Sequence, residues 1–223
     1  MKNFKILLAL LFVSVTFAQE TTSTTTKEKP KFYFTYGLNA QVHDELAIDK
    51  KLRAAGLPEV NSFTPELFIG MTLFDKKFSG DLDFGFLNSK NDNAGNENRY
   101  IGFTTRLRVH YNVINKEKIA FTTGLNLSNT QGELNIYAKN NAFDLNDLTP
   151  VNNVGNVSLK NSMVYFGPSA SLYLFKNKST KLRLNAGYEF AITNGKWKSD
   201  YASVNNTVKE QGNNRFVFGI TLL

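Results

Sequence analysis

The feature that most constrains this chain is an alternation of apolar and polar side chains that recurs in eight segments. The clearest segment spans residues 101–113, where Ile101, Phe103, Leu107 and Val109 alternate with polar neighbours. Successive side chains of a β-strand point to opposite faces, so this period predicts strands with one apolar and one polar face. The other segments span 32–42, 63–73, 81–86, 119–128, 164–174, 182–192 and 215–222. No helical period competes convincingly between residues 31 and 223, and we expect no helix there.

The connections between these segments alternate in length. Short turns are expected at 75–77, 115–117 and 176–180, and long, polar connections at 43–61, 88–98, 131–160 and 194–213. Short turns at one end and long loops at the other are typical of outer-membrane barrels, whose turns are periplasmic. An even number of strands allows the sheet to close, which removes edges that lipid would not tolerate. The sequence therefore predicts an all-β, eight-stranded antiparallel up-and-down transmembrane β-barrel over residues 31–223.

The N-terminal region has the pattern of a signal peptide over residues 1–18. Lys2 and Lys5 precede an apolar run that ends at Thr16-Phe17-Ala18, a suitable cleavage site. The run is shorter than the roughly 20 residues that a membrane-spanning helix requires, although an uncleaved anchor is the alternative. Residues 19–30 are Thr-rich and carry nothing to bury, which predicts a flexible lead-in. We therefore expect export through a cleaved signal peptide to the outer membrane.

Lysine and arginine are distributed differently along the chain. None of the 20 Lys lies inside the eight segments, whereas the polar faces carry Arg together with carboxylates. A face exposed to bulk water would carry scattered Lys, so we expect a crowded interior, in contrast to soluble lipocalin-like barrels, which are apolar inside. The predicted lumen charge network comprises Glu66, Asp81, Asp83, Arg106, Arg108, Arg183, Glu189 and Arg215, with His110 hydrogen-bonded to it.

Glycine and proline positions add detail to this prediction. Each segment has one glycine on its polar face, where the missing side chain makes room for long neighbours. Pro65 and Pro168 lie inside segments and each removes a backbone donor, so a bulge is expected at each. These glycines are Gly37, Gly70, Gly85, Gly102, Gly124, Gly167, Gly187 and Gly219.

The stretch Tyr165-Phe166-Gly167-Pro168-Ser169-Ala170-Ser171-Leu172-Tyr173-Leu174, together with the N-terminal pattern and the eight segments, resembles a known family. This is the small outer-membrane β-barrel domain family of Bacteroidota, which includes PorT-like proteins. The resemblance covers nearly the whole mature chain and implies the architecture, with Gly167 and Pro168 as structural positions. It implies no activity, because one fold hosts many functions.

Few residues are suited to catalysis. The chain has no Cys and two His, which disfavours a transition-metal site, and no phosphate-binding glycine loop is found. His43 precedes Asp44 and Glu45, which could orient a general base at the outer rim, but a solvated loop histidine is the simpler interpretation. We expect no enzyme activity, no cofactor and no bound metal.

The net charge of +7 is explained by lysines that crowd the short turns, where they can meet anionic lipid. For an exported chain we expect no nucleic-acid partner. The expected partners are outer-membrane lipid and lipopolysaccharide, the barrel assembly machinery during biogenesis, and a surface protein.

Trp197 and Tyr201 are predicted in the outer aromatic girdle, with a recognition loop as the alternative.

Three functions fit these observations. The first is a non-enzymatic barrel whose loops serve surface interaction, envelope integrity or an accessory role in secretion. The second is a lipid A-modifying enzyme that uses His43 at the rim. The third is a narrow pore, which the lumen charges disfavour. The sequence favours the first.

Overall fold

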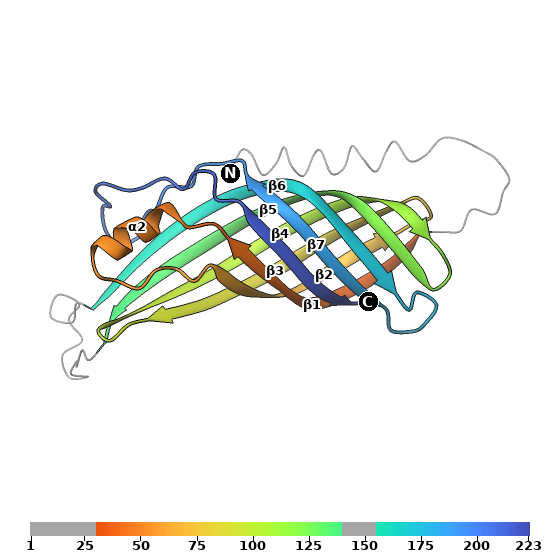
Figure 1. The fold of residues 1–223 in the computed structure, drawn as a ribbon, viewed down its shortest axis with the longest axis horizontal. Coiled ribbons are helices and arrows are strands. Elements are labelled where there is room, and N and C mark those ends of the chain that lie inside the picture. The colour runs from red at the N-terminus through yellow and green to blue at the C-terminus, as the bar shows by residue number, and fades with distance from the viewer. Residues whose placement is uncertain (1–29, 140–154) are drawn as a thin grey trace.

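The computed structural model describes residues 30–139 and 155–223, so the predicted signal peptide, nearly all of the lead-in and the middle of the third long connection lie outside the described residues. Eight antiparallel strands form a closed barrel in sequence order, and β8 pairs with β1, which confirms the predicted fold class (Figure 1). The strands are β1 (Lys31–His43), β2 (Phe63–Phe74), β3 (Phe78–Asp92), β4 (Asn96–Asn115), β5 (Ile119–Ala138), β6 (Asn156–Leu174), β7 (Leu182–Ala191) and β8 (Arg215–Leu222).

The two faces of the barrel wall reverse the usual arrangement of a water-soluble protein. Phe34, Leu67 and Ile69 point outward and expose 77%, 63% and 67% of their surface, whereas Glu66 and Arg106 point inward and expose none. Large apolar side chains are normally buried and charges exposed, so an outer surface of this kind suits a hydrocarbon environment. Among the described residues, no helix has the length and apolarity to span a membrane.

Both ends of the described barrel wall meet at the short-turn end. The backbone of Leu223 exchanges two hydrogen bonds of 3.0 Å with Lys181 in the turn between β6 and β7. Helix α2 and the long connection between β7 and β8 lie together at the opposite end (Figure 1). The barrel therefore has one end of tight turns and one end of elaborated loops, as the alternating connection lengths predict.

Several strands are longer than predicted. β4 and β5 have 20 residues each, about twice the 9–11 residues that cross a bilayer. The expected long connection at 88–98 is wrong, because β3 and β4 continue pairing until a turn at residues 93–95. The expected connection at 131–160 is also too long, since β5 and β6 extend into it. Beyond the apolar band the outward side chains become polar, as at Lys90, Arg99 and Glu133, so the pairing continues while the apolar alternation stops.

The first long connection contains helix α2 (Ala47–Ala54), so the expectation of no helix in this part of the chain is wrong. Ile48 and Leu52 are four residues apart and lie on one buried face of the helix. One pair of apolar residues is too little to produce a recognisable period, which explains why the sequence pattern missed this helix.

The bulge expected at Pro65 is wrong. Pro65 pairs with Ala40 of β1 in an unbroken register. On its other side, the ladder between β2 and β3 begins only at Glu66. The missing donor of Pro65 therefore falls beyond the start of this ladder, where a distortion is not needed.

The bulge expected at Pro168 is also wrong. Pro168 pairs with Leu125 of β5 without a shift. Toward β7, the described ladder passes over Gly167 and Pro168 and resumes at Ser169 in the same register. A local loss of pairing, rather than an inserted residue, accommodates this proline. A register shift occurs instead between Asn112 and Ile114 of β4, against β5.

Candidate functional site

The predicted lumen residues lie in two charged clusters inside the barrel. In the cluster nearer the long loops, the Arg106 guanidinium donates to both carboxylate oxygens of Glu66, at 2.8 and 3.1 Å. Its Nε donates to Glu189 at 3.2 Å. Arg215 donates from Nε to the second oxygen of Glu189 at 2.7 Å. Two arginines and two carboxylates from four strands therefore form one continuous chain of ion pairs across the lumen.

Neutral side chains satisfy the remaining donors and acceptors of this cluster. Arg215 also donates to Gln41 at 2.7 Å and to Ser128 at 2.9 Å, and its guanidinium lies 3.7 Å from the ring centroid of Tyr165. Ser128 in turn donates to Glu189 at 2.9 Å. Such charge-assisted and stacked contacts are the ones for which arginine is better suited than lysine. This explains why the polar faces carry Arg and no Lys.

The second cluster lies nearer the short turns. Arg183 donates to Asp81, and also to Thr72 at 3.0 Å and Thr221 at 3.1 Å. Arg108 lies 2.7 Å from Asp83, measured from Nη1 to Oδ2. Each arginine thus has a carboxylate partner in the barrel interior.

His110 lies beside the second cluster and exposes 1% of its surface. One ring nitrogen is 2.8 Å from the Thr122 hydroxyl and the other is 2.6 Å from the Ser169 hydroxyl. The Ser169 hydroxyl also donates to Asn126 at 2.7 Å. This histidine and serine are therefore hydrogen-bonded to each other within a largely buried polar network, in which they expose 1% and 8% of their surface.

The lumen is filled by these side chains. Four arginines face four carboxylates, so the formal charge of the network is zero with His110 neutral. Buried charges are costly unless they are paired with opposite charges, as each one is here. Glycine supplies the space: a Cβ atom placed on Gly85 would lie 2.3 Å from a carboxylate oxygen of Glu66. The interior of a barrel this size is wide enough only for packed side chains.

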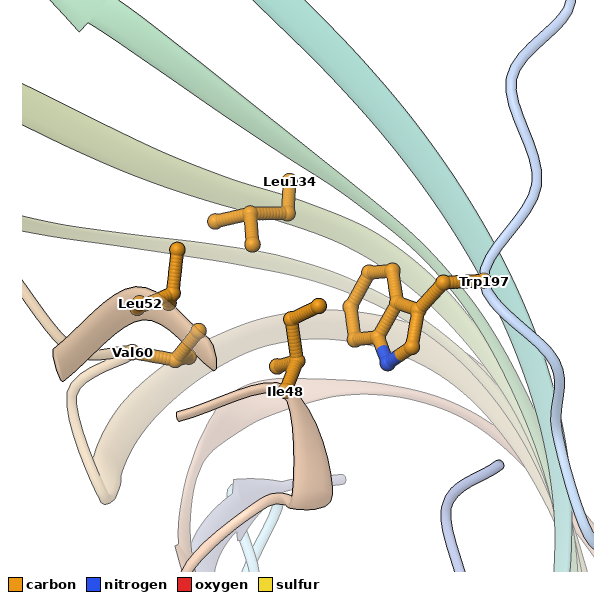
Figure 2. Close-up of a cluster of buried hydrophobic side chains, with 5 residues drawn as sticks. All are labelled: Ile48, Leu52, Val60, Leu134 and Trp197. Carbon is orange, nitrogen blue, oxygen red and sulfur yellow. The ribbon is translucent and has the colours of Figure 1, made fainter. Parts of the chain in front are cut away.

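The long-loop end is covered by a hydrophobic cluster, which we call the loop plug. Figure 2 shows its members drawn from α2, from the segment after it, from β5 and from the connection between β7 and β8. They are Ile48, Leu52, Val60, Leu134 and Trp197. Trp197 exposes only 2% of its surface, so its predicted place in the outer aromatic girdle is wrong. The indole turns inward because α2 offers an apolar face, whereas Tyr201 in the same connection is exposed.

Glu210 connects the two long connections of the loop plug. Its buried carboxylate accepts hydrogen bonds from the backbone N–H groups of Ala47 and Ile48, at 2.6 and 3.0 Å, and thus holds the start of α2. The same carboxylate accepts the indole N–H of Trp197 at 2.6 Å. A carboxylate near a helix N-terminus is favoured by both the free N–H groups and the helix dipole.

Asp49 ties the helix to the segment that follows it. Its carboxylate accepts the backbone N–H of Leu46 at 2.9 Å and that of Val60 at 2.8 Å. Burial raises the pKa of Asp49, while these hydrogen bonds oppose the rise.

On the exposed side of α2, Arg53 donates to Glu59 at 2.6 Å, and this contact lowers the pKa of Glu59. The amide of Asn98 on β4 donates to the carbonyl of Glu59 at 2.7 Å.

His43, the candidate rim base, ends β1 and is partly exposed. Its Nδ1 lies 2.9 Å from the backbone carbonyl of Asp44. Glu45 is paired with Arg53 at 2.9 Å. The imidazole therefore contacts a backbone carbonyl, while the carboxylate of Glu45 is engaged by Arg53. In the described parts of the chain, no group of three His, Asp or Glu side chains is placed to hold a metal ion.

Sequence reasoning missed the residues that close the long-loop end. Glu210 and Asp49 lie in polar connections without periodicity, so nothing in the pattern distinguishes them from solvated acids. Asn98 lies in β4, inside the range 88–98 for which the sequence predicts a loop. Trp197, the one tryptophan of the chain, is the signal that could have been used, because a large aromatic residue inside a polar connection often has a packing partner.

No protein-family model matches this chain, and no curated protein matches it either. Among solved structures, Ail, the attachment invasion locus protein of Yersinia pestis, is 9% identical, with a TM-score of 0.47 over 87% of this chain and 99% of that chain. Neisserial surface protein A is 11% identical, with a TM-score of 0.43 over 87% and 99%. The outer-membrane protein AlkL is 11% identical, with a TM-score of 0.38 over 92% and 96%. Similarity at this level assigns no activity or partner to this chain.

Proposed function

We propose that this chain is an integral outer-membrane β-barrel without catalytic activity, and that its long-loop end presents a surface to partners outside the cell. The observation that carries the proposal is the inverted distribution of side chains in a closed barrel. Apolar residues cover the outer wall, while every arginine of the lumen network is paired inside it. A closed barrel with an apolar outer band is one of the two structures that can span a bilayer.

A role as an open pore is disfavoured by two barriers in series. The first is the lumen charge network, whose ion pairs cross the interior between β2, β4, β7 and β8. The second is the loop plug, in which Glu210 fastens α2 to the connection between β7 and β8. The barrel is therefore best suited to act as a rigid support for its outer end.

The surface available to a protein partner is the part of β3, β4, β5 and β6 that continues beyond the apolar band. This part of the strands carries exposed ion pairs, such as the one between Lys90 and Glu97 at 2.7 Å. Rigid strands present side chains more reproducibly than mobile loops do, which suits recognition or support of the envelope. The resemblance to PorT-like barrels of Bacteroidota extends this proposal to an accessory role in secretion, and a deletion strain that still exports its surface proteins would dismiss that role.

The location is tested by gel mobility and protease shaving of intact cells. A folded barrel in the outer-membrane fraction should shift in mobility on boiling, and external protease should cut only at the long-loop end. Cuts at the turns around Lys76 or Lys116, or the absence of a mobility shift, would contradict the proposal. Sequencing of the mature N-terminus should begin at Gln19 if the signal peptide is cleaved as proposed.

The absence of catalysis is tested through lipid A, the substrate of the alternative function. We expect the lipid A mass profile of a deletion strain to equal that of the parent. A changed profile that is restored by the native gene, and not by the His43→Ala variant, would establish the rim histidine as a catalytic base and replace this proposal.

A further inference from the structure

The outer wall has a sharp boundary between apolar and charged residues. Along β4, the outward side chains are mostly apolar from Val113 to Ile101, and the next outward residue is the exposed Arg99. Phe103 pairs across the strands with Phe86, and the two expose 48% and 50% of their surface. On this side of the barrel, the apolar band therefore ends near Ile101.

Lysines gather on the same wall directly beyond this boundary. After β7, the chain continues beside β6, where Lys198 and Lys160 exchange two backbone hydrogen bonds of 2.6 and 2.9 Å. A second bridge pairs Lys196 with Lys209. Because strand residues alternate between faces, Trp197 enters the loop plug while Lys196 and Lys198 point outward and are exposed.

These lysines and the aromatic residues line one groove of about 920 Å³. Four lysines of the groove, Lys160, Lys196, Lys198 and Lys209, face two carboxylates, those of Glu133 and Asp200. Lys160 is paired with Asp200 and lies 3.8 Å from Glu133. Within the described parts of the chain, the other three lysines have no ion-pair partner, so the groove carries an excess of positive charge beside an apolar wall.

We propose that this groove binds the phosphate-bearing headgroup of an anionic lipid of the outer leaflet. Lysine binds phosphate as a point charge, and it gains affinity at an anionic lipid surface. Acyl chains of the same molecule would lie along Phe86, Ile101 and Phe103. A soluble anion would use the lysines but not this apolar wall, and an uncharged lipid would use only the wall. The inference rests on the proposed membrane location and adds a defined lipid site to it.

Binding is tested with the purified full chain in detergent, titrated with bisphosphorylated lipid A and followed by native mass spectrometry. The test variant combines Lys196→Gln, Lys198→Gln and Lys209→Gln. Each charge at a lipid surface contributes about fivefold in affinity, so the triple variant should bind about 100-fold more weakly. The matched control, K76Q/K77Q/K178Q, removes three exposed lysines at the short-turn end, outside the groove, and should lose far less affinity than the groove variant.

Two further measurements make the result decisive. Dephosphorylated lipid A should bind the parent far more weakly than the bisphosphorylated form, and raised salt should weaken the latter. If the glutamine variant fails to shift in mobility on boiling, the K196R/K198R/K209R variant replaces it and should keep its affinity. Unchanged binding by the glutamine variant, an equal loss in the control, or no preference for phosphate would overturn the site. Cell fractionation tests the location separately, so the two proposals can fail independently.

Discussion

At the scale of single residues, the lumen depends on arginines that each serve more than one partner. Arg106 holds Glu66 through two hydrogen bonds and Glu189 through a third. In water these charges would be solvated separately, whereas inside the barrel each charge is stabilised by its oppositely charged neighbours. Removing a single member therefore leaves its buried partners with less compensating charge.

Replacing Arg106 by methionine should lower the free energy of unfolding by about 3–5 kcal/mol, because Glu66 loses its buried arginine partner and Glu189 keeps only Arg215. Urea titration of the folded barrel in lipid measures the change. The control Arg53→Met removes an exposed cation and should cost less than about 1 kcal/mol. Equal losses in the two variants would contradict the account of the lumen.

The carboxyl group of Asp49 should titrate above its ordinary pKa of 3.8, because burial is the largest influence on it. A raised pKa means that the folded chain binds the proton more tightly than the unfolded chain. Its contribution to stability is thus fully present below the ordinary pKa and is lost as the pH rises through the raised value. Carbon-13 NMR of the carboxyl group measures this pKa, and a value at or below 3.8 would refute the prediction.

At the scale of elements, α2 is held by tertiary contacts rather than by its own stability. A helix of 8 residues is too short to persist alone in water. Its first N–H groups are satisfied by Glu210, and its apolar face packs on Trp197 and Leu134. The helix and the connection between β7 and β8 therefore depend on each other.

The Glu210→Ala variant should loosen the loop plug, because the N–H groups of Ala47, Ile48 and Trp197 lose their shared acceptor. Trp197 is the one tryptophan of the chain, so its emission reports on this site alone. We expect blue-shifted emission, protected from acrylamide, in the parent, and red-shifted, quenchable emission in the variant. Glu117→Ala, in an exposed short turn, is the control. Equal quenching of parent and Glu210→Ala would argue against the plug.

The elements also show what the sequence can predict. Between Ile101 and Val113, lipid and lumen impose opposite demands on neighbouring residues, so the alternation is strong and the strand is predicted correctly. Between Asn88 and Asn98, the outward side chains are polar and the buried inward residues, such as Asn98, are polar too, so the pairing leaves no apolar alternation in the sequence. The lumen residues could be named from their faces, but the contact of Glu210 with α2 joins residues more than 160 positions apart, which local patterns do not encode.

At the scale of the whole molecule, the polar interior, the apolar band and the covered outer end together form one closed cylinder. Planar-bilayer recordings of the purified barrel should show no steady conductance, because the lumen charge network and the loop plug both obstruct the axis. Recordings on an equal amount of heat-denatured protein provide the baseline. A steady, ohmic channel in the native protein would revive the pore function.

The central claim, that the apolar face meets acyl chains, is tested most directly by site-directed spin labelling in lipid bilayers. The chain has no native Cys, so single substitutions of Leu38, Ile69, Leu125 and Ile220 place one label each on the outer wall. Collisions with oxygen should exceed collisions with a water-soluble nickel chelate at all four positions, and the reverse should hold for Lys50→Cys on α2. A preference for the nickel chelate at the four wall positions would contradict the account.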